Sequence, residues 1–187
     1  DNFGELWLLA GATSPFTITG NGFGLYNKIE NSSTNLFTIN TDGIYARDGS
    51  IELNPVDGDI TIGAPVELDD NATVNVYDGG NGHTLTFNGA LSNGNGSGGN
   101  GQIILNQTST VIFAADNDYG GTTINSGTTL KVGTGGTAGT LGVGNTLNDG
   151  SLFFNRSNDS SYGGIISGVG TLTKQGAGVL TLSGANT

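Results

Sequence analysis

Four side chains have the types and the order that acid–base chemistry on a sugar chain requires. They are Asp42, Asp69, Asp70 and His83, each beside a glycine, an asparagine or a second aspartate. Inverting glycoside hydrolysis needs a carboxylic acid and a carboxylate base about 6.5–9.5 Å apart, and stacked coils could bring these carboxylates to one face. Aspartate is also a common turn former. We interpret the three aspartates as turn formers, predict no catalytic residue and expect that the chain is not an enzyme.

A second group of acidic residues offers the hard oxygen ligands that Ca²⁺ accepts in turns. No EF-hand spacing occurs, and two near matches to G-G-x-G-x-D, at 79–84 and 98–103, lack the final aspartate. We therefore expect no cofactor and at most weak calcium binding. The candidate ligands are Asp57, Asp59, Asp69, Asp70, Asp116 and Asp118.

Other reactive combinations are missing from the sequence. His83 is the only histidine and there is no cysteine, so thiolate sites and triads have no complete set of residues. Thr84-x-Thr86 and Thr171-x-Thr173 have the form of arrays that bind ice on flat β-helix faces. They stand isolated in the sequence rather than once per coil, so ice binding is not expected.

Composition excludes several partners. The 187 residues carry a net charge of −11 from 16 acidic and 5 basic side chains. Phosphate backbones need clusters of Lys and Arg, so nucleic acid is not an expected partner. No stretch approaches the length of an apolar membrane helix, and no membrane insertion is expected. The absence of methionine indicates a processed product or an excerpt of a longer chain.

Short alternating runs separated by Gly, Asn, Asp and Ser predict many short strands and tight corners. With 35 glycines and no strong helical segment, the pattern predicts an all-β, right-handed, single-stranded parallel β-helix of about eight coils with roughly 20–25 residues each. The predicted strands are 16–18, 36–39, 51–53, 60–62, 66–68, 74–76, 85–87, 103–105, 111–113, 122–124, 130–132, 152–154 and 180–182.

Two matches within the chain indicate internal repetition. Residues 168–187 match 99–118 at an offset of 69, and 151–155 match 84–88 at an offset of 67. We expect one β-helical domain over 1–187, with repeat-like units at about 57–133 and 134–187. Two segments, 89–101 and 133–150, are expected as protruding loops. The corner residues Asn81, Asn100, Asn117 and Asn186 are candidates for amide ladders between coils.

The C-terminal segment resembles a known motif. Residues 168–187, GVGTLTKQGAGVLTLSGANT, are similar to the autotransporter-associated β-strand repeat, and Tyr119 to Leu130 resembles the second half of that motif. The resemblance implies a passenger region of a type V secreted protein. It would lie outside the cell or on the outer surface of a Gram-negative bacterium, as an adhesin or scaffold. We expect the solenoid to continue at both ends, through the same polypeptide or a second subunit.

A weaker resemblance points to polysaccharides. Polygalacturonases carry Asn-Thr-Asp, Asp-Asp, Gly-His-Gly and Arg-Ile-Lys in this order. This chain has Asn40-Thr41-Asp42, Asp69-Asp70 and Gly82-His83, but Thr84 follows the histidine and Arg-Ile-Lys is missing. A β-helix that acts on or binds polysaccharide is therefore the alternative to a structural or adhesive solenoid. The ligand in either case would be a polysaccharide or a host surface.

Overall fold

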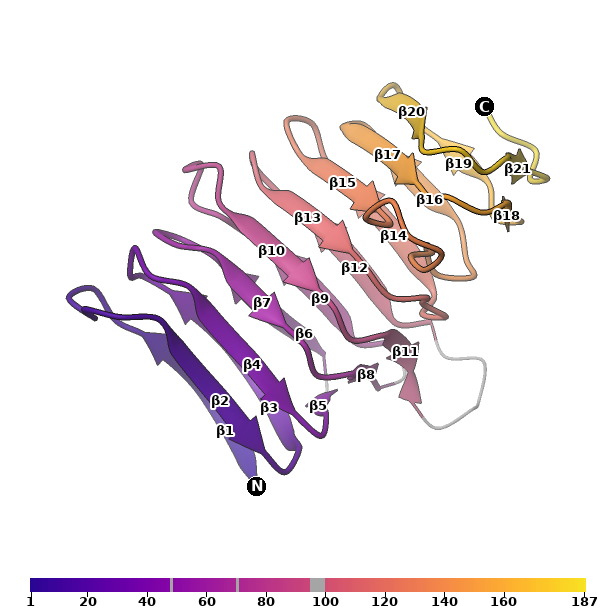
Figure 1. Cartoon of the computed structure of the whole chain (residues 1–187). Coiled ribbons are helices and arrows are strands. Elements are labelled where there is room, and N and C mark those ends of the chain that lie inside the picture. The colour runs from indigo at the N-terminus through magenta and orange to yellow at the C-terminus, as the bar shows by residue number, and fades with distance from the viewer. Residues whose placement is uncertain (48, 70, 95–99) are drawn as a thin grey trace.

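The chain winds into a parallel β-solenoid of about eight turns with its termini at opposite ends (Figure 1). The computed structural model describes residues 1–47, 49–69, 71–94 and 100–187. These residues form strands, turns and loops, with no α-helix among them. Every strand pairing among the described residues is parallel, because the paired strands come from successive turns of the chain. The predicted β-helix is therefore confirmed.

The solenoid has three sides, which we call A, B and C in the order in which the chain visits them. Two long strands, β1 (Asn2–Leu8) and β3 (Phe23–Asn31), begin on side C, bend at the corner and continue on side A. Phe23 to Leu25 of β3 pair on side C, and Lys28 to Glu30 pair on side A. The remaining strands of side A are β6 (Ser50–Asn54), β9 (Thr73–Val76), β12 (Gln102–Leu105), β14 (Gly121–Ile124), β16 (Thr146–Asn148) and β19 (Ile166–Ser167).

Side B is a continuous sheet with one strand in each of the eight turns. One turn measures between 19 residues, from Val111 to Leu130, and 26 residues, from Leu85 to Val111. The strands of side B are β2 (Phe16–Gly20), β4 (Phe37–Thr41), β7 (Ile60–Ile62), β10 (Thr84–Phe87), β13 (Thr110–Phe113), β15 (Thr129–Val132), β17 (Ser151–Asn155) and β20 (Thr171–Gln175).

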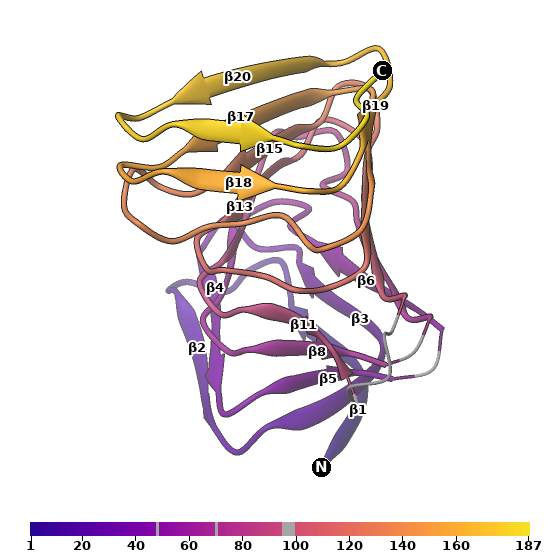
Figure 2. The same ribbon diagram turned by 90° about the vertical axis from the view of Figure 1, so that its right-hand side faces the viewer.

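Side C is less regular and is seen face-on in Figure 2. Its strands are β5 (Ile44–Ala46), β8 (Val66–Leu68), β11 (Leu91–Asn93), β18 (Ser160–Tyr162) and β21 (Leu180–Leu182). β5, β8 and β11 stack on one another, while β18 pairs only with β21 near the C-terminal end. Between the two stacks, residues 133–145 follow the turn as a loop whose Leu141 reaches the core.

Alternation along each strand builds the core. Inward positions carry Ile, Leu, Val and Phe and are buried, while outward positions carry Thr, Asn, Glu or Ser. Stacking places like side chains over one another, so Phe87 packs edge-to-face on Phe113 at 5.7 Å between ring centroids. Phe113 packs in the same way on Tyr119, at 5.9 Å. Burial raises the pKa of Tyr119, whose hydroxyl hydrogen-bonds Thr122 Oγ1 at 2.7 Å.

All the predicted strands are present, but some boundaries and loops differ from expectation. Leu91 to Asn93 form β11 inside the predicted loop 89–101, because Leu91 continues the buried column of side C. Residues 95–99 of that loop lie outside the described residues. The predicted loop 133–150 is a loop only to Asn145, since Thr146 to Asn148 form β16. The 67-residue match relates β10 to β17 on side B, whereas the 69-residue offset relates β20 on side B to β12 on side A.

The expected asparagine ladders take a different form. Asn117 Oδ1 accepts the Leu91 N–H at 2.8 Å, and Asn186 Oδ1 accepts the Ile166 N–H at 2.7 Å. Asn81 Nδ2 donates to the Val56 carbonyl at 2.8 Å. These amides therefore bridge neighbouring turns through backbone groups rather than by stacking on one another, which satisfies corner groups that the sheets leave unpaired.

Glycines line the corner between sides C and A. Gly101, Gly120, Gly144, Gly164 and Gly184 occupy this corner in five successive turns, each just before the chain enters side A. Backbone bonds join Gly120 N to Gly101 O at 2.9 Å and Gly144 N to Gly120 O at 2.7 Å. A Cβ on any of the last four would overlap the carbonyl of the preceding glycine in this series. The close approach of the turns here depends on the missing side chains.

Candidate functional site

The residues that suggested glycoside chemistry lie at three different corners of the solenoid. Asp42 lies between β4 and β5 at the B–C corner, and Asp69 follows β8 at the C–A corner. His83 precedes β10 at the A–B corner. Asp70 lies outside the described residues. Stacking thus does not bring Asp42 and Asp69 to one face, because the full width of side C separates the B–C corner from the C–A corner.

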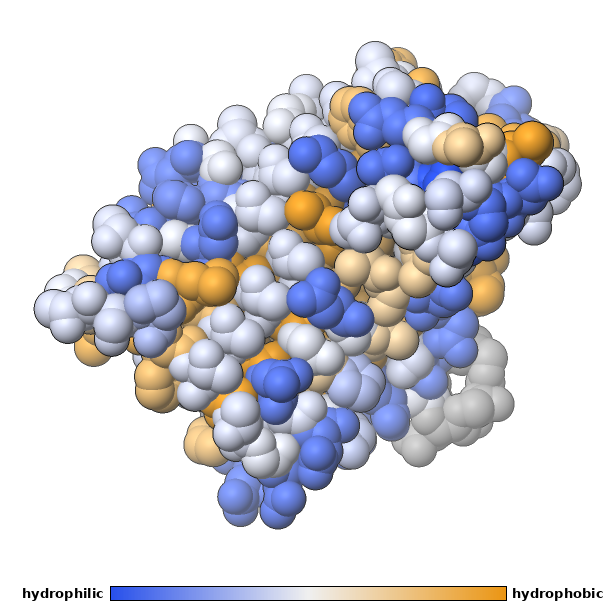
Figure 3. All heavy atoms as spheres, in the orientation of Figure 1, coloured by the Kyte–Doolittle hydropathy of each residue, from blue (hydrophilic) through white to orange (hydrophobic). Residues whose placement is uncertain are grey.

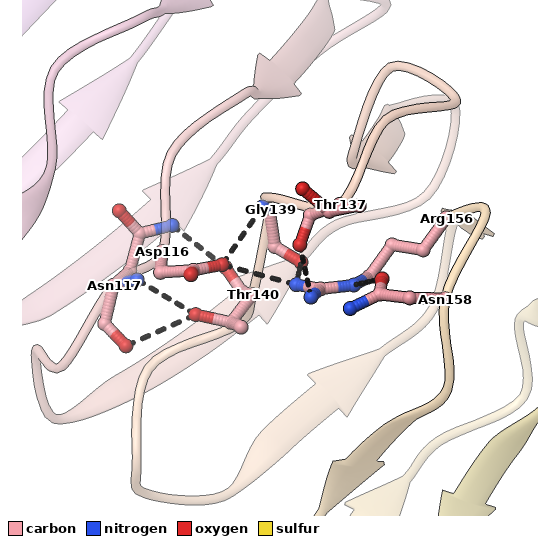
Figure 4. A network of polar contacts seen from close by, with 7 residues as sticks. All are labelled: Asp116, Asn117, Thr137, Gly139, Thr140, Arg156 and Asn158. Carbon is pink, nitrogen blue, oxygen red and sulfur yellow. Dashed lines mark hydrogen bonds and ion pairs between the residues drawn. The ribbon is translucent and has the colours of Figure 1, made fainter. Parts of the chain in front are cut away.

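The most connected polar cluster centres on Arg156, at the B–C corner after β17 (Figure 4). Its side chain is almost fully buried, and Nη1 donates to Asp116 Oδ1 at 3.0 Å and to the Gly139 carbonyl at 2.8 Å. Nη2 donates to the Thr137 carbonyl, and Nε donates to Asn158 Oδ1 at 3.2 Å. A planar guanidinium has donors in the fork that such a set of acceptors requires.

Asp116 and Asn117 extend this cluster along the axis. Asp116 Oδ1 also accepts the Gly139 N–H at 2.9 Å. Three hydrogen bonds join Asn117 to Thr140. Its backbone N–H donates to Thr140 Oγ1 and its Nδ2 to the Thr140 carbonyl, both at 2.6 Å, and Thr140 Oγ1 donates to the Asn117 carbonyl at 3.1 Å. Since Asn117 also binds Leu91, the cluster joins four successive turns and anchors the loop 133–145. Its donors and acceptors are directed at one another, which makes it a structural brace.

The calcium candidates are separated and in part already paired. Asp69 Oδ1 accepts from Arg47 Nη1 at 2.8 Å, and Asp116 pairs with Arg156. Asp59 Oδ1 accepts the Thr84 N–H at 2.8 Å and lies 3.6 Å from His83 Nδ1. Asp57 lies at the same A–B corner as Asp59, Asp118 lies on side C, and Asp70 is outside the described residues. Across the described ranges, no three His, Asp or Glu side chains are close enough together to hold a metal ion.

Two charged residues that are buried in the described part of the chain, Asp78 and Arg156, were missed from the sequence. Asp78 is fully buried, and its two carboxylate oxygens accept the N–H groups of Gly80 and Gly82, both at 2.8 Å. The Asp-Gly-Gly-Asn-Gly run that encodes this turn was interpreted only as an incomplete calcium motif. Arg156 had one available signal, since it is one of only two arginines in the chain.

A shallow groove of about 580 Å³ crosses five turns of side A, next to the C–A corner. Its walls carry neutral polar side chains such as Asn71, Thr73, Gln102, Thr123 and Asn145, and its floor includes Gly120, Gly121 and Gly144. The glycine corner described above leaves the floor open. The described residues that line it include no charged and no aromatic side chain, and their chemistry suits an uncharged ligand with many hydroxyl groups.

A smaller hollow of about 380 Å³ lies on side C, where residues 139–143 separate from β18. Leu141, Phe154 and Leu180 form its apolar part. Tyr162 lies in its wall, with its hydroxyl donating to the Gly144 carbonyl at 2.6 Å and bonded to Thr146 Oγ1 at 2.8 Å. Burial raises the pKa of Tyr162. The phenol therefore stays neutral at physiological pH. Its two hydrogen bonds connect side C to the glycine corner between sides C and A.

Both ends of the solenoid leave core positions open. Phe16 is 48% exposed, although Phe37, its register partner one turn inward, is fully buried. At the other end Leu172 is 39% exposed, whereas its partner Leu152 is fully buried. Neither outer coil is covered by another segment of the described chain. The edge strands at both ends therefore present unpaired backbone groups and an apolar interior.

Comparisons with family models, with curated proteins and with solved structures found no match to this chain. In the described part of the chain, no helix has the length and apolar character needed to cross a membrane.

Proposed function

We propose that this chain is part of a rigid structural or adhesive array outside the cell, in which further β-coils lengthen the solenoid at both ends. The observation that carries the proposal is the open core of the two outer turns. Solenoids with free ends normally carry polar caps, because an uncapped coil leaves its apolar interior in water. A following coil would bury Phe16 at one end and Leu172 at the other.

The extracellular location and the adhesive role rest on different support. Both are supported by the resemblance of residues 168–187 to the autotransporter-associated repeat. They are also consistent with a sequence of 16 acidic and 5 basic residues that has no cluster of basic side chains. The polar contacts that we describe brace the turns against one another, which suits a load-bearing rod. The coil that adds to each end belongs either to the same polypeptide or to another subunit.

Charging an open end should prevent end-to-end association. We expect the purified chain to form concentration-dependent rods by negative-stain electron microscopy and light scattering. Phe16→Glu should lower the association constant at least tenfold and so favour monomers, because the new carboxylate would be buried in the contact. Val143→Glu, at an exposed corner away from both ends, is the control. A wild-type chain that stays monomeric at all concentrations would contradict self-stacking and leave covalent continuation as the form of the array.

The groove on side A supports a second candidate function, binding of a neutral polysaccharide. A glycan lying along the axis would meet hydrogen-bonding side chains in successive turns, including Gln102 and Thr123. The net charge of −11 argues against an acidic polymer such as polygalacturonate, which the chain would repel.

Removal of the groove's outward amide and hydroxyl should weaken glycan binding. With a panel of soluble neutral and acidic polysaccharides, we expect calorimetric binding of a neutral member and at least a fivefold loss in Gln102→Ala/Thr123→Val. Thr86→Val, an outward threonine on side B, serves as the control because it lies outside the groove. Equal affinity of all three proteins would exclude the groove as the binding site.

A further inference from the structure

The hollow on side C marks a place where two successive turns separate. On the other two sides these turns pair directly, β14 with β16 and β15 with β17. On side C they pair in opposite directions: Thr140 N–H donates to the Ala115 carbonyl of the turn before at 3.3 Å, whereas β18 pairs with β21 of the turn after. Figure 2 shows β18 and β21 apart from the stack of β5, β8 and β11. No backbone hydrogen bond joins residues 139–143 to residues 160–163.

Backbone groups on both edges of this gap lack a partner. In a parallel pair, alternate residues of a strand direct both their N–H and their C=O to the same neighbour. Ser160 N–H and the Tyr162 carbonyl bond the β21 side in this way, at 2.8 and 3.0 Å. The N–H and C=O of Ser161, between them, therefore point to the other edge of β18, where Ser161 lines the hollow. On the facing edge, the N–H and C=O of Leu141 also make no hydrogen bond to another described residue.

The interior of the hollow is apolar. Leu141, Phe154 and Leu180 line it from three successive turns. Ser160 is the register partner of Leu180, and its short side chain leaves the leucine accessible from the hollow. Successive side chains of a strand point to opposite faces. A strand placed in the gap would thus direct one side chain onto this apolar surface and its neighbours to the solvent.

The charged side chains around the gap favour a basic ligand. The described residues that line the hollow carry no charge, and the exposed charged residues nearest to it in the chain are Asp116, Asp118 and Asp159. Arg156 is almost fully buried and is paired with Asp116. With a net charge of −11, the chain attracts cationic partners and repels acidic ones.

We propose that side C binds an extended peptide segment of another protein as an added β-strand between residues 139–143 and β18. The segment is neutral or basic, bonds the free backbone groups of Ser161 and Leu141, and places a small apolar residue on Phe154. In such strand addition, main-chain hydrogen bonds supply affinity and the pocket for the inward side chain supplies selectivity. A purely apolar small molecule suits the gap less well, because it would leave the backbone groups of both edges without partners.

The test uses the peptide acetyl-Lys-Thr-Val-Thr-Lys amide, which has one apolar side chain between polar neighbours and a basic residue at each end. Calorimetry should detect its binding to the wild-type protein. The same peptide N-methylated at its three central residues keeps the side chains but cannot donate backbone hydrogen bonds, so it should bind at least tenfold more weakly. Equal binding of both peptides, or no binding of either, would overturn the proposal.

Ser160→Leu should block the site, because the new side chain would lie over Leu180 and fill the hollow from within. We expect at least a tenfold loss of peptide affinity, with a melting temperature at or above that of wild type. Ser151→Leu is the matched control, since Ser151 is an outward residue of β17. It lies on side B, which Figure 3 shows with residues of intermediate hydropathy among smaller polar and apolar areas. Equal affinity of the two variants would exclude the hollow as the binding site.

Amide hydrogen exchange followed by NMR locates the added strand. The Ser161 and Leu141 amides should exchange rapidly in the free protein and at least tenfold more slowly with the peptide bound. Binding without this protection would also overturn the proposal. The inference does not depend on end-to-end association, and the Phe16→Glu protein should bind the peptide as wild type does.

Discussion

Arg156→Ala should lower the free energy of unfolding by about 3 kcal/mol, because a buried side chain is truncated and the acceptors around its guanidinium lose their donor. The guanidinium is the common donor to Asp116, to the carbonyls of Thr137 and Gly139, and to Asn158. Its loss leaves the buried Gly139 carbonyl without this donor, and water cannot easily replace a side chain that is only 9% exposed. The loop 133–145 should detach first, since this cluster ties it to the turns on both sides of it.

Arg47→Ala is the matched control for this change. Arg47 also pairs with an aspartate, at 2.8 Å from Asp69, but its side chain is 34% exposed and the pair lies at an open corner. Exposed ion pairs contribute about 0–1 kcal/mol, so this variant should remain close to wild type in urea denaturation followed by circular dichroism. Arg156→Lys should be intermediate, because an ammonium group cannot reproduce the fork. Equal losses for Arg156→Ala and Arg47→Ala would show that the cluster does not brace the solenoid.

Most strands could be predicted from the sequence because their signal is local, although β1, β3, β5, β18, β19 and β20 were not among the predicted segments. Thr84-Leu85-Thr86-Phe87 alternates polar and apolar residues within four positions, and the structure makes it β10. β11 was not predicted, because Leu91 is the only large apolar residue in a segment rich in Gly, Asn and Ser. Its register with Val66 identifies it as a strand residue. Alignment between turns is hidden in the sequence for a related reason, since turns of 19 to 26 residues separate the residues that the backbone pairing places in register.

The candidate sites required three-dimensional information of another kind. The order Asp42, Asp69, His83 suggested one catalytic face, but the positions of these residues along the turn assign them to different corners. Asp116 and Arg156 are 40 residues apart and meet because the loop 133–145 takes up the side C segment of the turn between them. Variable turn lengths thus decide which polar residues meet, and no spacing rule in the sequence encodes them.

Gly144→Ala should destabilise the middle of the solenoid by about 3 kcal/mol, at the upper part of the usual range for overpacking. A Cβ at this position would overlap the Gly120 carbonyl, whose oxygen accepts the Gly144 N–H at 2.7 Å. The methyl group therefore cannot be accommodated by rotating a side chain. It has to push two turns apart, which breaks the bond at the glycine corner and disturbs the hydrogen bond from Tyr162 to the Gly144 carbonyl.

Gly136→Ala makes the same chemical change where a Cβ would meet no atom within 4 Å, and it should leave stability nearly unchanged. Because each turn contacts only its neighbours, a weakened junction should also lower cooperativity. We expect the Gly144→Ala protein to melt in two steps, with the turns before and after this junction unfolding separately, whereas the Gly136→Ala protein melts as wild type does. Calorimetry distinguishes the outcomes. A single, unshifted transition for Gly144→Ala would show that the corner can open without cost, and close contact through Gly101, Gly120, Gly144 and Gly164 would then not hold the turns in register.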